Sequence, residues 1–428
     1  MRRLQFDIVV VGAGPAGIAA ATMAARSGAY VGVIDDNPAP GGQIWRGRQA
    51  APATMYSPRQ LSGPSNGSIV LLSCTRAVTP LAAGGLIAES AAETLEIHYE
   101  QLILATGARE HFLPFPGWTL PGVMGAGGLQ ALAKGGFPIT GKQVVVAGSG
   151  PLLLAVATYL KRHGARVRLI AEQASWDRLA AFAISLMRYP QKLAEAAGLG
   201  VQLLGIPFRA NCWVMRAYGE KRIEAVMLCQ GERRRIEPCD YLACGFGLVP
   251  NVELAAGFGC AVAGGAVLVD RWQQTGVHGV FAAGEVTGVG GVDLSLVEGE
   301  IAGLAATDQH QAARALFARR ERARRFAAAI ERGFGLRPEL RRLAEDDTIV
   351  CRCEDVTFGE LSRHASWRGA KLHTRCGMGP CQGRVCGTAT QFLFGWSQDA
   401  VRPPITPARL DSLAQDLEMV QCEEESPI

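Results

Sequence analysis

The stretch from Asp7 to Asp35 limits the fold of this chain more strictly than any other part of the sequence. Asp7 to Val11 is continuous in isoleucine and valine, which is typical of a buried parallel strand. The turn Gly12-Ala13-Gly14-Pro15-Ala16-Gly17 then opens an alanine-rich helix, and a second strand, Tyr30 to Ile34, ends at Asp35. This order predicts a dinucleotide-binding βαβ unit. The glycines let a pyrophosphate approach the helix N-terminus, and the acid accepts hydrogen bonds from a ribose.

A second pattern of the same kind starts after Lys142. Val144 to Ala147 and Val167 to Ala171 predict strands on either side of the turn Gly148-Ser149-Gly150-Pro151-Leu152-Leu153. Leu153 replaces the third glycine, which normally allows close helix–strand packing, so we expect this helix to stand off slightly. Three alternatives remain open here: NAD(P), ADP or ATP bound without redox chemistry, or no ligand. The candidate binding residues are Gly148, Gly150 and Glu172.

Cysteines gather near the C-terminus in two pairs, Cys351 with Cys353 and Cys381 with Cys386. Thiolates at these spacings can converge on one compact inorganic centre. The glycine-rich segment between the pairs lets backbone N–H groups approach the sulfurs. Such hydrogen bonds stabilise the negative charge of an iron–sulfur centre and raise its potential, and nearby arginines act in the same direction (Arg352, Arg375 and Arg384).

Two other occupants of the cysteine motif remain open. Structural zinc usually takes pairs spaced C-x2-4-C, and a disulfide is uncommon in a chain with the character of a cytosolic protein. Cys376 also lies inside the motif, at a position where we expect no ligand. An exchange of roles between Cys376 and Cys381 remains an alternative.

The motifs CRCEDVT and TRCGMGPCQGRVC resemble the ferredoxin-like 2Fe–2S domain related to bacterioferritin-associated ferredoxin. Similar domains end the α subunits of opine oxidases, hydrogen cyanide synthase and heteromeric proline dehydrogenases, and anaerobic glycerol-3-phosphate dehydrogenase. The resemblance implies a 2Fe–2S cluster held by Cys351, Cys353, Cys381 and Cys386.

Three further motifs accompany the first βαβ unit: Gly41-Gly42-Gln43-Ile44-Trp45, Ala105-Thr106-Gly107 and Gly279 to Glu285, the last followed by a helix that contains Glu298-Gly299. Together they resemble the FAD domain of the two-dinucleotide-domain flavoproteins, the architecture of thioredoxin and glutathione reductases. In that family an aspartate contacts the ribityl chain of the flavin, and Glu285 stands in its place. The resemblance implies FAD bound by Gly12, Gly14, Pro15, Ala16, Gly17, Asp35, Asp36, Gly42, Gln43, Ala105, Thr106, Gly107, Gly284 and Glu285.

The predicted fold class is α/β, with two Rossmann-like dinucleotide-binding domains and a small helical C-terminal 2Fe–2S domain. We expect an FAD-binding domain at 1–115 and 246–310 and a second nucleotide-binding domain at 116–245. A basic linker helix at 311–345, the 2Fe–2S domain at 346–396 and a strap with an acidic tail at 397–428 complete the chain. The linker helix, running from Gln311 to Arg332, is either a solvated strap or a docking face for a partner.

The composition and the motifs that the chain lacks exclude several function classes. The net charge of +4 argues against a dedicated nucleic-acid binder. Glycines and prolines interrupt the two apolar runs that imitate a signal peptide and a membrane span, so we expect no transmembrane segment. A disulfide reductase needs a redox-active cysteine pair beside the flavin, and the sequence has none near residues 38–50. We also identify no catalytic triad or H-E-x-x-H motif and therefore assign no catalytic residue.

From Phe6 to Trp396 the sequence resembles the α subunit, with FAD and 2Fe–2S, of heteromeric amine dehydrogenases. The resemblance implies a bacterial, cytoplasmic subunit, with a peripheral link to the inner membrane and quinone as an option. A partner β subunit of the D-amino-acid/sarcosine oxidase type would oxidise an opine, proline or hydroxyproline, or glycine. Further expectations are a small ferredoxin-like subunit, together with FMN at a subunit interface. The alternatives are a self-sufficient NAD(P)H-dependent flavin/2Fe–2S reductase and a non-catalytic scaffold with structural zinc.

Overall fold

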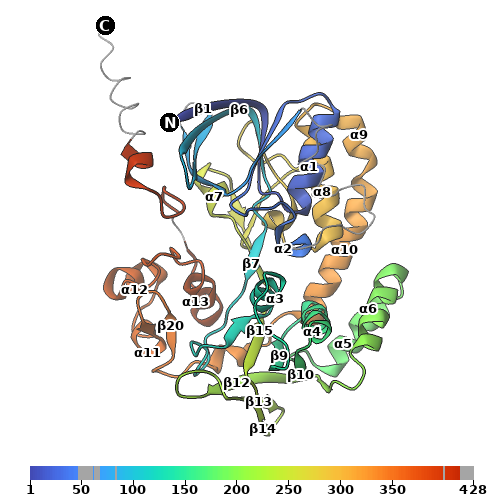
Figure 1. Cartoon of the computed structure of the whole chain (residues 1–428), viewed down its shortest axis with the longest axis vertical. Helices are drawn as coiled ribbons and strands as arrows, with labels where there is room; N and C mark the ends of the chain where they lie inside the picture. The colour runs from blue at the N-terminus through green and yellow to red at the C-terminus, as the bar shows by residue number, and fades with distance from the viewer. Residues whose placement is uncertain (47–60, 62–67, 82–83, 399–400, 415–428) are drawn as a thin grey trace. The chain divides into compact units, whose positions relative to one another are not determined.

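The computed structural model describes residues 1–46, 61, 68–81, 84–398 and 401–414. The chain divides into two compact units, and many of their helices and strands are labelled in Figure 1. The first comprises Met1–Arg109, Pro250–Phe326 and Ala400–Ile428, and the second comprises Glu110–Val249 and Ala327–Asp399. Each contains parallel strands joined through helices, which confirms the predicted α/β class.

The first unit is built on a seven-stranded sheet of β1 (Arg2–Val11), β2 (Val31–Ile34), β3 (Ile69–Leu72), β4 (Thr75–Leu81), β5 (Gly85–Ser90), β6 (Thr94–Leu104) and β19 (Val280–Ala282). The order is β3-β2-β1-β6-β5-β4, and β19 pairs with β6. β1 is parallel to β2 and β6, and β19 is parallel to β6. The ends of β1, β6 and β19 therefore meet at one edge of the sheet, where the Rossmann arrangement places a nucleotide.

Helices α1 (Pro15–Arg26) and α8 (Val292–Ala305) lie side by side in this unit (Figure 1). A Cβ on Gly299 would lie 2.2 Å from the carbonyl oxygen of Ala16, and one on Gly303 would lie 2.3 Å from that of Ala20. Only glycine permits so close a backbone approach. Helix α8 therefore fixes the position of α1, whose N-terminus carries the first predicted site.

Shorter elements complete the first unit and the segments of chain that lead into and out of the second. They are α2 (Gly42–Trp45), β7 (Ala108–Glu110), β16 (Leu248–Pro250), α7 (Glu253–Gly257), β17 (Val262–Ala263), β18 (Ala266–Val267) and the 3-10 helix η2 (Gly284–Thr287).

The second unit contains a five-stranded parallel sheet in the order β11-β10-β9-β15-β8. Its strands are β8 (Val123–Gly125), β9 (Gln143–Gly148), β10 (Arg166–Glu172), β11 (Phe208–Arg209) and β15 (Tyr241–Gly245). The helices of this region are α3 (Ala126–Lys134), α4 (Leu152–Arg162), α5 (Trp176–Leu186) and α6 (Pro190–Gln202). A separate antiparallel sheet comprises β12 (Cys212–Tyr218), β13 (Ala225–Gln230) and β14 (Arg233–Pro238).

Leu153, which replaces the third glycine of the second motif, is buried with 1% of its surface exposed. A Cβ added to Gly245 on the neighbouring strand β15 would lie 3.1 Å from Cδ2 of Leu153. The space that Leu153 needs is therefore available because β15 ends in a residue without a side chain.

The cysteine motif forms a small module within the second unit, with a core of its own. Its elements are β20 (Ile349–Cys351), β21 (Val356–Thr357), α11 (Phe358–Leu361), α12 (Trp367–Thr374) and α13 (Cys386–Phe394). The 3-10 helix η3 (Pro338–Arg342) precedes it, and Leu340 and Leu343 bury their side chains in the core beneath β12 and β13.

The expectation of one basic helix from Gln311 to Arg332 is wrong, because the structure has two helices, α9 (His310–Ala315) and α10 (Phe317–Phe334). The ring of Trp272 lies 4.8 Å from that of His310 and 5.0 Å from that of Phe317, so it packs against both sides of the break. In the part of the chain that the structure describes, no helix is both long and apolar enough to cross a membrane.

Candidate functional site

The first glycine-rich turn is shaped to receive a phosphate group. Gly12 has φ of 108°, and a Cβ there would lie 2.2 Å from the carbonyl oxygen of Ala105. A Cβ on Gly17 would lie 1.8 Å from the carbonyl oxygen of Gly12. The N-cap residue of α1 is Gly14, which has no side chain to cap the helix, as is typical of a helix N-terminus that receives an anionic ligand.

Asp35 is held at the end of β2 in the position that binds ribose in Rossmann folds. Its Oδ2 accepts the N–H of Ala13 at 2.6 Å, and its Oδ1 accepts the N–H of Asn37 at 2.8 Å. Asp36, the other predicted acid, is exposed and accepts Nδ2 of Asn37 at 3.0 Å. The carboxylate of Asp35 is thus tied to the glycine turn itself.

The remaining residues predicted to bind FAD gather near the same edge of the sheet. Gly41 donates its N–H to the carbonyl of Ala13 at 2.7 Å, and a Cβ on Gly42 would lie 3.0 Å from Cα of Gly14. Gln43 is exposed, whereas Ala105, Thr106 and Gly107 directly follow β6. Thr106 Oγ1 donates to the carbonyl of Asn251 at 2.7 Å, and Asn251 returns a hydrogen bond from Nδ2 to the carbonyl of Thr106 at 2.9 Å.

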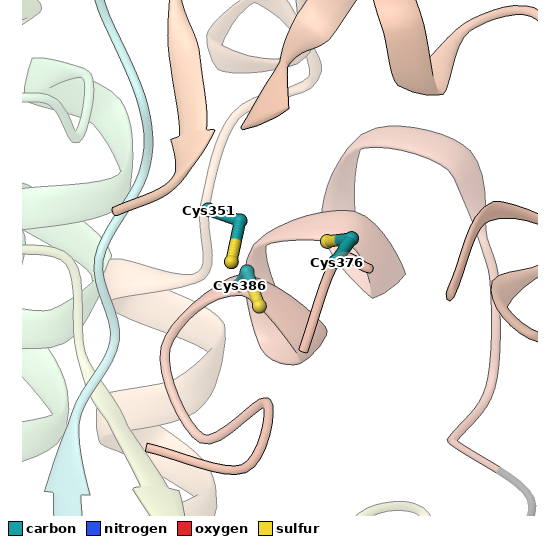
Figure 2. Close-up of side chains that lie close together, drawn as sticks. All are labelled: Cys351, Cys376 and Cys386. Carbon is teal, nitrogen blue, oxygen red and sulfur yellow. The ribbon is translucent and has the colours of Figure 1, made fainter. Parts of the chain in front are cut away.

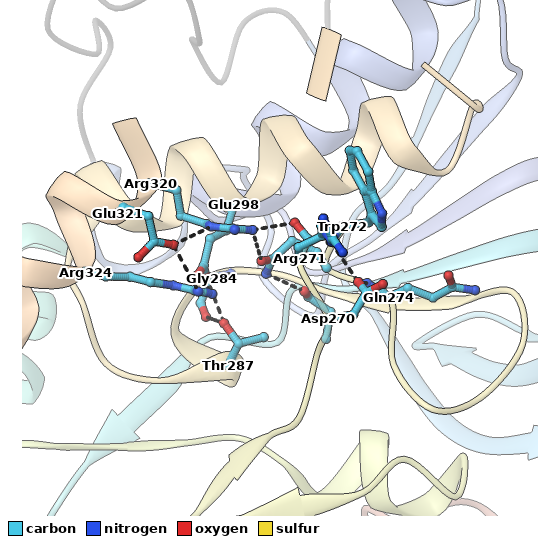
Figure 3. Close-up of polar contacts among 12 residues, drawn as sticks. Asp270, Arg271, Trp272, Gln274, Gly284, Thr287, Glu298, Arg320, Glu321 and Arg324 are labelled. Carbon is cyan, nitrogen blue, oxygen red and sulfur yellow. Dashed lines mark hydrogen bonds and ion pairs between the residues drawn. The ribbon is translucent and has the colours of Figure 1, made fainter. Parts of the chain in front are cut away.

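Gly284 and Glu285 follow β19, and Gly284 is held by Glu298 of the helix expected to follow this motif (Figure 3). Glu298 of α8, with 1% of its surface exposed, accepts the N–H of Gly284 at 3.2 Å and the hydroxyl of Thr287 at 2.8 Å. Its other oxygen pairs with Arg324 of α10 at 3.1 Å. Burial raises the pKa of Glu298, and the contacts with Thr287 and Arg324 oppose that rise.

The second glycine-rich turn has the same design with a different acid. Gly148 has φ of 143°, and a Cβ there would lie 1.9 Å from the carbonyl oxygen of Gly245. Glu172 accepts the N–H of Gly150 at 2.8 Å and the N–H of Ala174 at 2.9 Å. Burial raises the pKa of Glu172 to about 7, although these N–H groups favour its charged form.

The segment that follows α10 packs against this second turn, which local sequence patterns could not indicate. The Oγ of Ser149 donates to the carbonyl of Phe334 at 2.6 Å. Gln173 donates from Nε2 to Ser149 Oγ at 2.8 Å and accepts the N–H of Arg337 at 3.1 Å. Arg178 of α5 donates to the carbonyl of Gly335 at 2.9 Å. One wall of the second site is therefore formed by the chain that leads to the cysteine module.

Three buried thiols converge in the cysteine module (Figure 2). The sulfur atoms of Cys351, Cys376 and Cys386 lie within 4.8 Å of one another. Cys381 extends this group, because its thiol contacts those of Cys386 and Cys353. All four predicted ligands thus belong to one continuous group of thiols. Cys376, which the resemblance left outside the ligand set, lies at its buried end.

Backbone N–H groups and neighbouring thiols favour the thiolate form at two of these cysteines. Contacts with the thiols of Cys376 and Cys386, aided by backbone N–H groups, lower the pKa of Cys351 to about 2. The thiol of Cys386, aided by backbone N–H groups, lowers the pKa of Cys381 to about 5. The pKa values of Cys353, Cys376 and Cys386 are instead raised, so the thiols of this group share the remaining protons, which a metal centre would displace.

Two glycines of the cysteine loop are required by an aromatic ring. Gly377 and Gly383 both have φ of 79°, and a Cβ on Gly377 would lie 2.6 Å from the ring of Trp367. Trp367 thereby supports the loop that carries Cys376 and Cys381. Gly379 packs against Cys353 of the first cysteine pair, since a Cβ on Gly379 would lie 2.3 Å from Cβ of Cys353.

Two Rossmann-type turns, each with its acid, and a compact thiol centre define the class of this protein as an oxidoreductase of the two-dinucleotide-domain flavoprotein type. Residues 6–315 match the family described as pyridine nucleotide-disulphide oxidoreductase. The chain is 33% identical to the HcnB subunit of hydrogen cyanide synthase from Pseudomonas aeruginosa, over 92% of each chain. It is 32% identical to an opine oxidase subunit of Rhizobium meliloti, over 96% of this chain and 99% of the relative.

Among solved structures, L-proline dehydrogenase from P. horikoshii superposes with a TM-score of 0.70 at 19% identity, covering 96% of this chain and 80% of that one. Thioredoxin reductase of T. acidophilum superposes with a TM-score of 0.51 at 21% identity, covering 71% and 98%. The chain belongs to the pyridine nucleotide-disulphide oxidoreductase family and, within it, to the group that contains HcnB and the opine oxidase subunit.

Proposed function

We propose that this chain is the electron-transferring FAD and 2Fe–2S subunit of a heteromeric dehydrogenase that oxidises an amino-acid-type amine. The substrate is oxidised on a partner β subunit of the D-amino-acid/sarcosine oxidase type. Oxidation of an amine to an imine releases two electrons and two protons. The electrons leave through the cofactors of this chain, and opines and proline or hydroxyproline are the preferred substrates ahead of glycine.

The first glycine turn supports FAD as the resident nucleotide. The N-cap residue of α1 is Gly14, which has no side chain, and Gly12 and Gly17 make the close backbone approaches that shape the turn. Asp35 holds its carboxylate at the glycine turn, where a ribose would bind. Gly284 and Glu285 follow β19, which pairs in parallel with β6. When bound, FAD accepts two electrons and can pass them singly to a one-electron centre. The protein supplies binding, orientation and a fixed charge environment.

The observation that carries the proposal is that five cysteine thiols contact one another in one small module. A bound metal centre explains why they meet there. The donor set contains sulfur only, which fits an iron–sulfur centre. We expect Cys351, Cys353, Cys381 and Cys386 to hold it. Backbone N–H groups at Glu354, Gly377 and Gly383 donate to cysteine sulfurs and would stabilise the charge of a cluster.

The relatives support a heteromeric amine dehydrogenase. Two are named as subunits, of hydrogen cyanide synthase and of opine oxidase, and the chain spans nearly their whole length. The test is co-expression with the genes that neighbour this one, followed by an assay of dye-linked dehydrogenase activity on opines, proline, hydroxyproline and glycine. Activity on one of these amines that is lost without this chain supports the proposal. A purified complex that reduces dye with none of them contradicts it.

A self-sufficient NAD(P)H-dependent reductase is the second candidate function, and the position of Glu172 supports it. This carboxylate stands at the end of β10, opposite Gly148, as Asp35 stands at the end of β2. NADH or NADPH should bleach the flavin of the chain alone if this candidate is correct. An unchanged spectrum with both would exclude it.

A further inference from the structure

Trp118 joins the core of the second unit to the strand that carries the first cysteine ligand. Its side chain is 4% exposed, and its indole N–H donates to the carbonyl of Ile349 at 2.6 Å. Ile349 begins β20, and Cys351 ends it. A buried tryptophan usually pairs its N–H in this way, so the bond fixes the position of β20 relative to the core that contains Trp118.

Trp118 also holds the arginine between the two first cysteines. The guanidinium carbon of Arg352 lies 5.4 Å from the centre of the Trp118 ring, within the range of a cation–π interaction. Arg352 itself is exposed. Without the ring, its side chain would be free to extend into solvent, where its charge is screened.

We propose that Trp118 is a positioning residue for the iron–sulfur centre, acting through Arg352, which stands between Cys351 and Cys353 in the chain and whose guanidinium the ring holds in one place. The inference rests on the proposed 2Fe–2S centre and names the residues that set its potential. A positive charge held close to the centre stabilises the reduced form, which carries one more negative charge. The indole thus converts an otherwise mobile surface arginine into a fixed part of the electrostatic environment of the cluster.

The test is a redox titration of the full chain, with the visible and EPR signals of the cluster as readouts. In Arg352→Gln the midpoint potential should fall, so that the ratio of reduced to oxidised cluster at a fixed solution potential drops on the order of tenfold, about 59 mV for a one-electron couple. Trp118→Phe should show part of this shift, because phenylalanine attracts the cation more weakly. In the double variant, Trp118→Phe should add nothing to Arg352→Gln.

Trp213→Phe is the matched control. Trp213 is buried in the same core as Trp118, and the guanidinium carbon of Arg337 lies 4.0 Å from its ring centre. Because this pair lies outside the cysteine module, its loss should leave the potential and the EPR spectrum unchanged. An equal shift in Trp213→Phe would reduce the role of Trp118 to general core packing and overturn the inference.

Two further outcomes separate this inference from the proposed function. A wild-type chain without iron and acid-labile sulfide contradicts the proposed 2Fe–2S centre, and the inference falls with it. A wild-type chain with a normal cluster, but with the same potential in Arg352→Gln, overturns the inference alone. Because Arg352 is exposed, this outcome can be read whether or not Trp118→Phe folds; if it does not, Trp118→Tyr takes its place as the variant that weakens the cation–π contact.

Discussion

Glu172 shows how one residue can combine a binding geometry with an unusual protonation state. Its two oxygens accept backbone N–H groups at 2.8 and 2.9 Å, yet burial raises its pKa from 4.5 to about 7. The charged form is therefore disfavoured in the folded protein near neutral pH. Stability associated with this group is fully present below pH 4.5 and is lost as the pH rises through about 7.

Glu172→Gln should remove this pH dependence. We expect the free energy of unfolding of the variant relative to wild type to rise between pH 5 and pH 8, by on the order of 1–3 kcal/mol. Thermal unfolding at both pH values measures it. Glu195→Gln on the exposed surface of α6 is the control and should show no such trend. A difference for Glu172→Gln that stays constant with pH would contradict the raised pKa.

Serine replacements of single cysteines identify the ligands of the metal centre. We expect Cys353→Ser to lose most of the iron and Cys376→Ser to retain it, because the family resemblance implies the first and not the second as a ligand. Iron and acid-labile sulfide per chain are the measurements, and Cys229→Ser in strand β13 is the control. The reverse result would assign Cys376, which lies within 4.8 Å of the sulfurs of Cys351 and Cys386, to the centre.

At the scale of elements, the contact between α1 and α8 positions the first nucleotide turn. Gly299→Ala should destabilise the protein by about 1–3 kcal/mol, because the new methyl group would meet the carbonyl of Ala16. It should also lower the flavin content of the purified chain, since α1 must shift. Thermal unfolding and the flavin-to-protein absorbance ratio measure both effects.

Gly198→Ala in α6 is the matched control for this helix contact. A Cβ at Gly198 has no neighbouring atom within 4 Å, so the substitution should be neutral or stabilise the helix by up to about 1 kcal/mol. A full flavin content and an unchanged melting temperature in Gly299→Ala would contradict the role of α8.

Local sequence patterns predicted the two βαβ units because strand, turn, helix and acid are close together in the chain. The sequence singled out the helix that contains Glu298 but could not show its contact with Gly284, because that contact forms only after α8 has packed. Nor could they place Phe334 against Ser149, a contact between residues far apart in the sequence. The break at Leu316 was missed because the helical pattern continues through it, and only tertiary packing by Trp272 reveals it.

At the scale of the whole molecule, each unit contributes a separate chemical capacity to one oxidoreductase. The first offers a nucleotide turn with an acid, and the second carries both another such turn and the thiol centre. A protein of this kind can accept electrons in pairs and release them singly, provided that both FAD and a one-electron centre are present. The electron-transfer role of the chain therefore depends on its cofactor content.

The most direct measurement is an anaerobic visible spectrum of the purified chain before and after NADH, with iron, zinc and acid-labile sulfide determined on the same sample. We expect flavin and cluster absorption, with two iron and two sulfide per chain as a 2Fe–2S centre requires, and no bleaching by NADH. Zinc in place of iron would contradict the electron-transfer role and favour a structural scaffold. Rapid bleaching by NADH would instead make the chain a reductase in its own right.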